Sequence, residues 1–354
     1  LVVAIKKATP NTEVILLTAH GNIPDGVQAI KNGAFDYITK GDDNNKIIPL
    51  ISRAVEKARM NIRLEKLEKK VGQMYSFESI LGESKPLKEA VQLARKVSVT
   101  DVPVLLTGET GTGKEVFAQA IHYNSKRGKQ NFVAVNCSSF SKDLLESEMF
   151  GHRAGSFTGA LKDKKGLFEE ANNGTIFLDE MGEMAFELQA KLLRILETGE
   201  YIKIGDTKPT RVNVRIIAAT NRNLPEEIAA GRFREDLFYR LSVFQVHLPS
   251  LRERTGDIRI LAEAFVRSFS EKLSHPVTGM SPAYLAALCQ QMWKGNIREL
   301  RNVIERSLIV CDGECLEVCD LPLEIQNCHY EQSDEAVPGS FELSAMERRH
   351  IARV

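Results

Sequence analysis

The sequence predicts an α/β protein in which parallel strands alternate with helices, followed by a smaller unit of helices alone. Short apolar runs separated by stretches of helical periodicity occupy residues 103–107, 132–136, 175–180 and 212–219. Strands connected by helices form parallel sheets that are covered on both faces. After Pro249 the strand signal disappears. The helical patterns of the smaller unit occupy residues 257–273, 282–292 and 296–310.

The first part of the chain predicts half of another α/β domain. Residues 13–18 are an apolar run that indicates a buried parallel strand. A helix is expected from about Asp25 to Asn32, ended by Gly33, and then a strand at Asp36–Thr39. A long helix is expected after Asn44. This strand–helix–strand–helix order is half of a doubly wound domain.

The long helix continues without a strong breaker and carries apolar residues spaced by four and three. These residues are Met60, Leu64, Leu67, Val71 and Met74. Such spacing predicts a short coiled-coil seam, and a helix packed on its own domain is the alternative. The predicted division of the chain is 1–58, half-domain; 59–77, linker helix; 78–248, α/β unit; 249–327, helical unit; 328–354, polar linker and the start of a C-terminal domain.

Composition limits the classes of function. The 354 residues are 43% hydrophobic, and 47 Lys and Arg balance 47 Asp and Glu. Because DNA-binding segments carry a basic excess, we expect DNA contact only through a C-terminal domain that is missing here. No apolar run approaches the roughly 18–20 residues that cross a membrane. The chain opens at Leu1 without a signal peptide, so we expect a cut end and a cytoplasmic protein.

Four cysteines near the C-terminus raise the question of a metal site. Cys311, Cys315, Cys319 and Cys328 are close in sequence but lack paired C-x-x-C spacing. Structural zinc sites normally use such pairs, so we favour free thiols over a zinc site.

A glycine-rich segment has the pattern of a phosphate-binding loop. Gly108, Glu109, Thr110, Gly111, Thr112, Gly113 and Lys114 fit G-x-x-x-x-G-K, between a predicted strand and a predicted helix. Glycines let backbone N–H groups turn toward phosphates, and the lysine reaches the β- and γ-phosphates of a nucleotide such as ATP. Glu115 stands where a Ser or Thr ligand of Mg²⁺ is usual. The ion would then depend on phosphate oxygens, water and a separate carboxylate; a plain glycine turn is the alternative.

Two adjacent acids supply that carboxylate. Asp179 and Glu180 end the apolar run that starts at Thr175. Because the carboxyl ends of parallel strands share one edge of a sheet, both acids should lie beside the phosphate loop. Asp179 suits Mg²⁺, and Glu180 suits orienting the attacking water. An ordinary surface pair of acids is the alternative.

Further motifs resemble one family. They are GSFTGA at 155–160, FREDLFYRL at 233–241, LPSLRER at 248–254 and WKGNIRELRN at 293–302. With the phosphate loop and TIFLDE, they closely resemble the AAA+ domain of sigma-54-dependent activators, the NtrC family. The resemblance implies an AAA+ P-loop ATPase with a helical lid.

The resemblance implies a role for each motif. Gly155, Ser156, Phe157, Thr158, Gly159 and Ala160 would form the loop that contacts sigma-54, with Ser156 where the family usually has Ala. Arg234 and Arg240 would be arginine fingers that reach the ATP of a neighbouring subunit. Ordinary ion pairs with Glu235 or Asp236 are the alternative.

Other positions match sensing elements of the family. Asn221 corresponds to sensor I and Arg298 to sensor II, while Asn136 would hold Glu180 away from water. Helix capping is the alternative for the asparagines. Ile80, Leu81 and Gly82 would line the adenine pocket, and Lys294 stands where Pro is usual.

The N-terminal half-domain resembles the second half of a flavodoxin-like response-regulator receiver. Thr18 and Lys40 match its phosphoryl-sensing hydroxyl and lysine, with Gly41 where Pro is common. The acceptor aspartate would lie upstream of this chain. The resemblance therefore implies a sensor histidine kinase that acts on the longer protein.

We therefore expect an ATPase that assembles from dimers to a hexameric ring and remodels promoter complexes of the sigma-54 RNA polymerase holoenzyme. A nucleotide-gated scaffold would need neither Glu180 nor the arginines. A helicase or protease unfoldase would not need the Phe157–Thr158 loop, and a bare DNA-binding regulator disagrees with the neutral charge. The sequence does not reveal the promoters or the kinase.

Overall fold

The computed structural model describes residues 1–18, 23–39, 44–273 and 277–326. The chain divides into two compact units, the first ending at Ser76 and the second beginning at Phe77. Within the described residues no helix is long and apolar enough to span a membrane.

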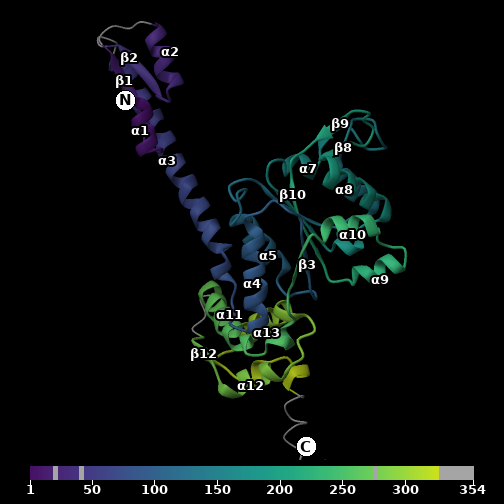
Figure 1. The fold of residues 1–354 in the computed structure, drawn as a ribbon. Coiled ribbons are helices and arrows are strands. Elements are labelled where there is room, and N and C mark those ends of the chain that lie inside the picture. Colours follow the sequence, from purple (N-terminus) through teal and green to yellow (C-terminus); the bar gives the residue numbers. More distant parts are fainter. Residues whose placement is uncertain (19–22, 40–43, 274–276, 327–354) are drawn as a thin grey trace, which may run out of the picture. The chain divides into compact units, whose positions relative to one another are not determined.

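The first unit contains a small parallel sheet (Figure 1). Its elements are α1 (Val2–Ala8), β1 (Ile15–Thr18), α2 (Ile23–Lys31), β2 (Asp36–Thr39) and α3 (Asn44–Met74). The predicted strand–helix–strand–helix order is present, and β1 pairs in parallel with β2. The expectation of a buried β1 was wrong. Leu17 is 61% exposed, because a sheet of two strands has few neighbours to cover it.

Helix α3 runs without interruption across the boundary that we predicted between residues 58 and 59. Met60 and Met74 are both exposed on it. The side chains of Leu64, Leu67 and Val71 lie outside the described residues, so the coiled-coil seam stays a prediction.

The second unit is built on a five-stranded parallel sheet. Its strands are β3 (Val104–Thr107), β4 (Phe132–Asn136), β7 (Thr175–Asp179), β10 (Arg215–Thr220) and β11 (Phe244–His247). Their order is β11-β3-β10-β7-β4. The four predicted strands are confirmed, whereas β11 was not predicted. Because β3 lies next to β10, and β10 next to β7, the loop after β3 and the end of β7 come to the same edge.

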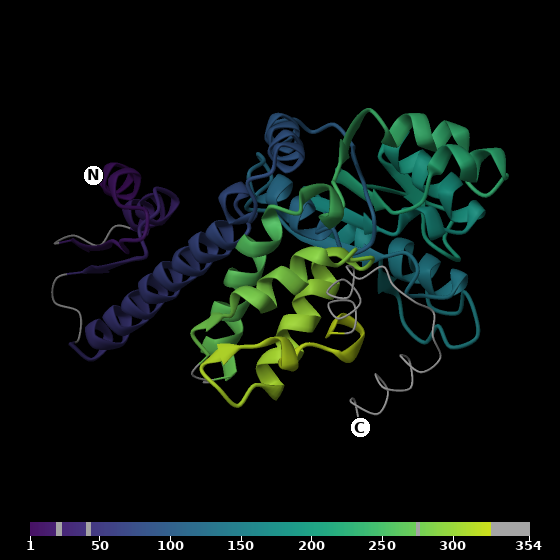
Figure 2. The ribbon, with the colours of Figure 1, turned by 90° about the horizontal axis from the view of Figure 1, so that it is seen from below.

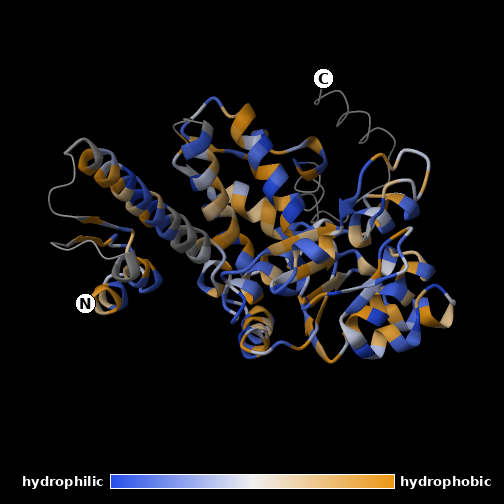
Figure 3. Ribbon diagram, turned by 90° about the horizontal axis from the view of Figure 1, so that it is seen from above, coloured by the Kyte–Doolittle hydropathy of each residue, from blue (hydrophilic) through white to orange (hydrophobic). Residues whose placement is uncertain are grey.

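Alternate residues of each central strand enter different cores. Phe177 packs with α4 (Lys85–Ser98) and α5 (Lys114–Tyr123) on one face. Ile176 and Leu178 pack on the other face, where the cluster includes residues of α6 (Lys142–Phe150) and α8 (Phe186–Thr198). Side chains of successive strand residues point to opposite faces, so a sheet covered on both sides needs an unbroken apolar run. Figure 3 shows apolar and polar residues mixed around the covering helices.

Short elements complete this unit. They are η1 (Phe77–Ser79), β5 (Gly151–His152), β6 (Lys164–Lys165), α7 (Leu167–Glu170), η2 (Met181–Glu183), β8 (Glu200–Ile202), β9 (Pro209–Arg211), α9 (Leu224–Ala229) and α10 (Glu235–Leu241). The strands β5 and β6 form one antiparallel pair, and β8 and β9 form another.

A helical lid follows the sheet, and its helices α11 and α13 pack together (Figure 2). Its elements are η3 (Leu251–Arg254), α11 (Asp257–Leu273), β12 (Gly279–Met280), α12 (Pro282–Gln290), α13 (Asn296–Val310), β13 (Cys315–Leu316) and η4 (Val318–Asp320). The three predicted helices are confirmed. The helical lid is confirmed, and within it β12 and β13 form a two-residue parallel pair that was not predicted. So short a pair leaves no periodic signal in the sequence.

Candidate functional site

A cavity of about 350 Å³ lies where the phosphate loop, the ends of three strands and the lid meet. The residues that line it are Thr110, Gly111, Gly113, Lys114, Glu115, Val116, Asn136, Asp179, Glu180, Asn221, Ile297, Arg298, Arg301 and Asn302. The predicted lysine, strand-end acids and polar sensing residues therefore come together in one place.

The loop between β3 and α5 has the backbone of a phosphate cradle. Gly108, Gly111 and Gly113 have φ values of 147°, 81° and 101°, which residues with a Cβ rarely adopt. A Cβ on Gly111 would lie 2.2 Å from the carbonyl oxygen of Gly295 in the lid. Glycine is therefore required there both by conformation and by the close approach of the lid.

Lys114 is folded back on this loop. Its Nζ donates to the carbonyl oxygens of Gly108 at 2.8 Å and Glu109 at 2.9 Å. Burial lowers the pKa of Lys114, and the charges of Asp179 and Glu180 act in the opposite direction. The ammonium group is thus a buried cation held next to carboxylates, where a bound anion would stabilise its charge.

The two strand-end acids have different surroundings. Burial raises the pKa of Asp179, while the N–H of Glu180, which donates to its Oδ1 at 3.0 Å, and the charge of Lys114 lower it. Burial disfavours a carboxylate that has no cation beside it, so Asp179 is suited to bind a cation as its ligand. Glu180 has left-handed backbone angles, with φ of 51° and ψ of 42°. That conformation is uncommon for a residue with a side chain.

Ser138 connects Asn136 to Glu180. The N–H of Ser138 donates to Asn136 Oδ1 at 2.9 Å, and its Oγ lies 2.8 Å from the same oxygen. The hydroxyl also forms a hydrogen bond with Glu180 Oε2. Asn136 is paired in register with Asp179 on the neighbouring strand. Ser138 was not predicted, because a serine in a turn carries no signal of its own.

Helix α13 supplies the lid side of the cavity. Arg298 was predicted there, whereas Arg301 and Asn302 were not. Arg301 follows Arg298 by three positions and Asn302 follows it by four, so all three share one face of the helix. This spacing can be read from the sequence. On the opposite side, Asn221 Nδ2 donates to Thr110 Oγ1 at 3.1 Å.

The lid is also joined directly to the phosphate loop. Glu109 accepts hydrogen bonds from both terminal nitrogens of Arg252, one of them 2.8 Å long, and from Asn296 Nδ2 at 3.1 Å. The Arg252 guanidinium holds the pKa of Glu109 below its usual range. Ile297 N–H donates to the carbonyl oxygen of Gly111 at 3.0 Å. We call these contacts of Glu109, Arg252, Asn296, Ile297 and Gly111 the lid latch.

The predicted adenine residues are not among those that line the cavity. Ile80 packs against the core on the α4 side of the sheet, and Leu81 is partly exposed. Gly82 approaches Asp257, whose carboxylate accepts the N–H of Glu83 at 2.7 Å. The assignment of these residues to adenine stays a prediction.

The two candidate arginine fingers lie outside the cavity of their own subunit. Arg234 pairs with Asp236 at 2.7 Å, so the ion pair that we considered as the alternative is present. Its guanidinium also lies 5.5 Å from the ring centre of Phe186. Arg240 donates to the carbonyl oxygen of Leu196 at 3.3 Å.

The loop 155–160 projects from the β5–β6 pair. Gly155 and Gly159 have φ values of 79° and 103°, and the N–H of Gly155 donates to the Ala160 oxygen at 2.8 Å. Phe157 packs edge-on against His152 with ring centres 4.9 Å apart, yet it is 45% exposed. Thr158 is exposed as well.

Two features of this loop were missed by sequence analysis. Leu161, directly after it, is 89% exposed and is a second exposed apolar side chain, four residues after Phe157. At the base, Arg153 forms ion pairs with Asp163 and with Asp206, the latter in the turn between β8 and β9. The loop is therefore anchored to the neighbouring hairpin.

The remaining predicted positions give less information. Thr18 ends β1, but its side chain and all of Lys40 and Gly41 lie outside the described residues, as does Cys328. Within the described part of the chain, no group of three or more His, Cys, Asp or Glu residues is arranged to hold a metal ion.

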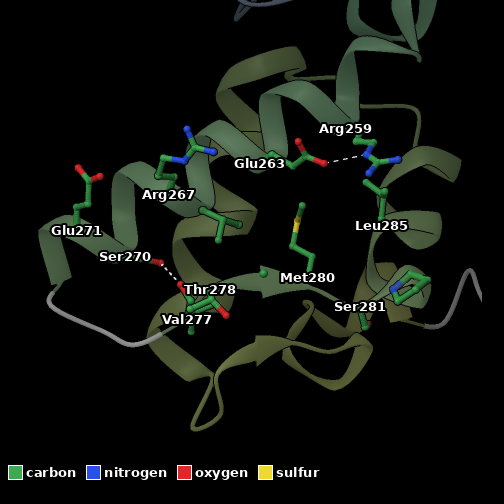
Figure 4. Close-up of a pocket in the computed structure, with 13 residues that line it drawn as sticks. Arg259, Glu263, Arg267, Ser270, Glu271, Val277, Thr278, Met280, Ser281 and Leu285 are labelled. Atoms are coloured by element: carbon green, nitrogen blue, oxygen red, sulfur yellow. Dashed lines mark hydrogen bonds and ion pairs between the residues drawn. The ribbon is translucent and has the colours of Figure 1, made fainter.

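A second cavity, of about 670 Å³, lies in the lid between α11 and β12 (Figure 4). The ion pair of Arg259 and Glu263, 2.8 Å long, lies on its wall. None of the predicted site residues lines this second cavity.

The chain is similar to known proteins over most of its length. Residues 80–247 match the family model of the sigma-54 interaction domain, and residues 252–338 match the AAA+ ATPase lid domain. The regulatory protein AtoC of Escherichia coli K12 is 43% identical over 315 residues, which are 89% of this chain and 68% of AtoC. The alginate biosynthesis regulator AlgB of Pseudomonas syringae pv. tomato is 42% identical over 346 residues, 98% of this chain and 76% of AlgB.

A solved structure has the same fold. The crystal structure of NtrX from Brucella abortus in complex with ADP superposes with a TM-score of 0.71 at 34% identity, covering 98% of this chain and 74% of NtrX. The same protein has been solved in complex with ATP. This chain therefore belongs to the sigma-54-dependent transcriptional activators, AAA+ ATPases of two-component systems that carry out ATP-dependent activation of sigma-54 transcription.

Proposed function

We propose that the 350 Å³ cavity binds ATP with Mg²⁺, and that its hydrolysis between the subunits of a ring drives the loop 155–160 against the sigma-54 RNA polymerase holoenzyme. The observation that carries this proposal is the composition of the cavity. Lys114 and Arg298 supply positive charge for phosphates, and Asp179 and Glu180 line the same cavity. Within one small cavity, these groups match the parts that phosphoryl transfer to water requires.

The donor set fits a magnesium ion that is shared with the nucleotide. Burial raises the pKa of Asp179, and a bound cation would stabilise its charged form. Glu115 takes the position of the usual hydroxyl ligand. Mg²⁺ prefers oxygen ligands and keeps several waters, so one protein carboxylate with phosphate oxygens is sufficient. The ion would neutralise charge on the phosphates, while Glu180 orients and polarises the attacking water.

The arginine fingers are proposed to act on the next subunit. Because Arg234 and Arg240 lie outside their own cavity, they reach a nucleotide only across a subunit interface. Planar guanidinium groups fit phosphate oxygens, and such a finger contributes about 10³–10⁵ in rate. For Arg234 the pair with Asp236 must open first; it is an exposed pair, and exposed pairs typically contribute only about 0–1 kcal/mol.

The predicted segments on either side of the cavity complete the proposal. The half-domain 1–58 is the end of a receiver on which a sensor histidine kinase acts, and 59–77 links it to the ATPase segment 78–248 and the lid 249–327. A C-terminal domain that begins within residues 328–354 would contact DNA. The protein is proposed to work in the cytoplasm, where sigma-54 polymerase is found.

Replacing Glu180 by Gln tests the catalytic assignment. The amide keeps the shape and the capacity to accept a hydrogen bond but loses the charge that polarises water. We expect ATP binding within about twofold of the wild type and turnover reduced by about 10²–10⁴, the usual contribution of a general base. Glu170→Gln, at an exposed acid outside the cavity, is the matched control. Unchanged turnover in Glu180→Gln would refute the assignment and favour a nucleotide-gated scaffold.

Replacing Thr158 by Ala tests the coupling. The residue is exposed on the loop, and it does not line the cavity. We expect normal ATP hydrolysis and loss of sigma-54-dependent transcription in a reconstituted assay. Retention of both activities would contradict the role of the loop.

A further inference from the structure

The turn after β4 contains a hydroxyl group shared by two acceptors of the catalytic cavity. Ser138 Oγ lies 2.8 Å from Asn136 Oδ1 and within hydrogen-bond distance of Glu180 Oε2. The backbone N–H of Ser138 already fixes the orientation of the Asn136 amide by donating to the same Oδ1 at 2.9 Å. The amide therefore presents an oxygen, and not its NH₂ group, to the hydroxyl.

A count of protons shows why this arrangement has two states. A serine hydroxyl carries one proton, and neither an amide oxygen nor a carboxylate oxygen can donate one. The hydroxyl can therefore donate fully to Glu180 or to Asn136, but not to both. Rotation about the Cβ–Oγ bond moves the proton from one acceptor to the other without any change in the backbone.

The fold does not depend on this side chain. Ser138 is exposed, and it contributes no apolar surface to the neighbouring core, which contains Cys137 instead. Its hydroxyl hydrogen bonds go to Asn136 and Glu180, two residues that line the cavity. A role in the reaction accounts for these contacts better than a role in folding.

We propose that Ser138 is a positioning residue that restrains Glu180. When the hydroxyl donates its hydrogen bond to Glu180, it occupies the carboxylate oxygen that would otherwise receive the proton of the attacking water. When the hydroxyl donates to Asn136 instead, that carboxylate oxygen is free. Asn136 thus acts on Glu180 through Ser138, and the inference rests on the proposed role of Glu180 as the group that activates water.

Replacing Ser138 by Ala removes the proton that competes for Glu180. We expect basal kcat for ATP hydrolysis, measured without sigma-54 polymerase, to rise about three- to tenfold, the equivalent of one ordinary hydrogen bond. KM for ATP should change by less than about twofold. Ser138→Thr retains the hydroxyl and should restore kcat close to the wild type. Ser139→Ala, at the exposed serine next in the chain, is the matched control and should leave kcat unchanged.

A double-mutant cycle tests the route through Ser138. If Asn136 acts by way of the hydroxyl, Asn136→Ala combined with Ser138→Ala should have the kcat of Ser138→Ala alone. Fully additive effects, or a Ser138→Ala kcat that is reduced or equal to that of Ser139→Ala, would overturn the inference. Glu180→Gln distinguishes failure of the proposed catalytic site from failure of this inference. If Glu180→Gln retains ATP turnover, the proposed catalytic site is refuted. If Glu180→Gln loses turnover but Ser138→Ala leaves kcat unchanged, only the role of Ser138 is refuted.

Discussion

The buried histidine under the central sheet should make the stability of the protein depend on pH. His122 is fully buried; its Nε2 lies 3.1 Å from the carbonyl oxygen of Gln130, and its Nδ1 lies 2.9 Å from Thr175 Oγ1. Because a carbonyl oxygen only accepts, Nε2 carries the proton and Nδ1 accepts from the threonine. A second proton on Nδ1 would reverse the latter hydrogen bond, so that Thr175 Oγ1 would accept instead of donate, and it would place a buried charge at the start of β7, the strand that ends at Asp179.

The size and sign of the effect follow from the pKa of His122. Burial lowers it from 6.5 to about 4, with a smaller contribution from the charge of Arg215, while the hydrogen bond to Gln130 raises it. Between these two values the unfolded chain binds a proton that the folded chain does not. Stability is therefore full above pH 6.5 and is lost as pH falls toward 4. A difference of about 2.5 in pKa, at about 1.4 kcal/mol per unit, corresponds to about 3.5 kcal/mol in full, of which about 3 kcal/mol is lost by pH 4, where the folded histidine is half protonated.

The measurement compares wild type with His122→Gln by urea unfolding between pH 7.5 and 4. Glutamine retains a donor for Gln130 but does not titrate, so this variant should be less stable at pH 7.5 and lose less stability on acidification. The difference between the unfolding free energies of wild type and His122→Gln should be smaller by about 2 kcal/mol at pH 5 than at pH 7.5. His247→Gln removes an exposed histidine and serves as the control. If wild type and His122→Gln lose stability in parallel from pH 6.5 to 4, the reasoning is refuted.

Two further predictions concern the site. Gly111→Ala places a methyl group 2.2 Å from a carbonyl oxygen of the lid, so ATP affinity measured with a fluorescent analogue should fall at least about tenfold, since the lid must shift and left-handed backbone is strained. Gly256→Ala, where a Cβ meets nothing within 4 Å, should bind normally, and equal affinities would contradict the close packing. Mixing inactive Arg240→Ala with inactive Glu180→Gln subunits should restore part of the ATPase activity if the arginine acts across an interface; a mixture that stays inactive at every ratio would argue against it.

The central strands were predictable because their burial on both faces requires continuous apolar runs. Residues 175–180 illustrate this, since three successive residues of the run fill cores on alternate faces. Strand β11 lacks this signal, because Gln245 and His247 interrupt its apolar pattern and lie exposed at the edge of the sheet. Edge strands need cover on fewer sides, so their sequences are less constrained.

The candidate site was predictable to the extent that its residues belong to recognisable motifs. The phosphate loop, Asp179, Glu180 and Asn221 all meet in the cavity because parallel strands bring their carboxyl ends to one edge. Ser138 was not predictable, since its importance depends on which side chains a turn brings within 3 Å. The ion pair of Arg234 with Asp236 was predicted only as the alternative to an arginine finger, because the sequence does not decide between the two.

The lid latch has a consequence for the release of product. Asn296 Nδ2 and Ile297 N–H both bond to backbone carbonyl oxygens of the loop that would surround the phosphates. If departure of the γ-phosphate lets that loop relax, these two bonds would carry the change to the first turn of α13. Each protomer would thus display its hydrolysis state as a change in lid angle, at a distance from the chemistry.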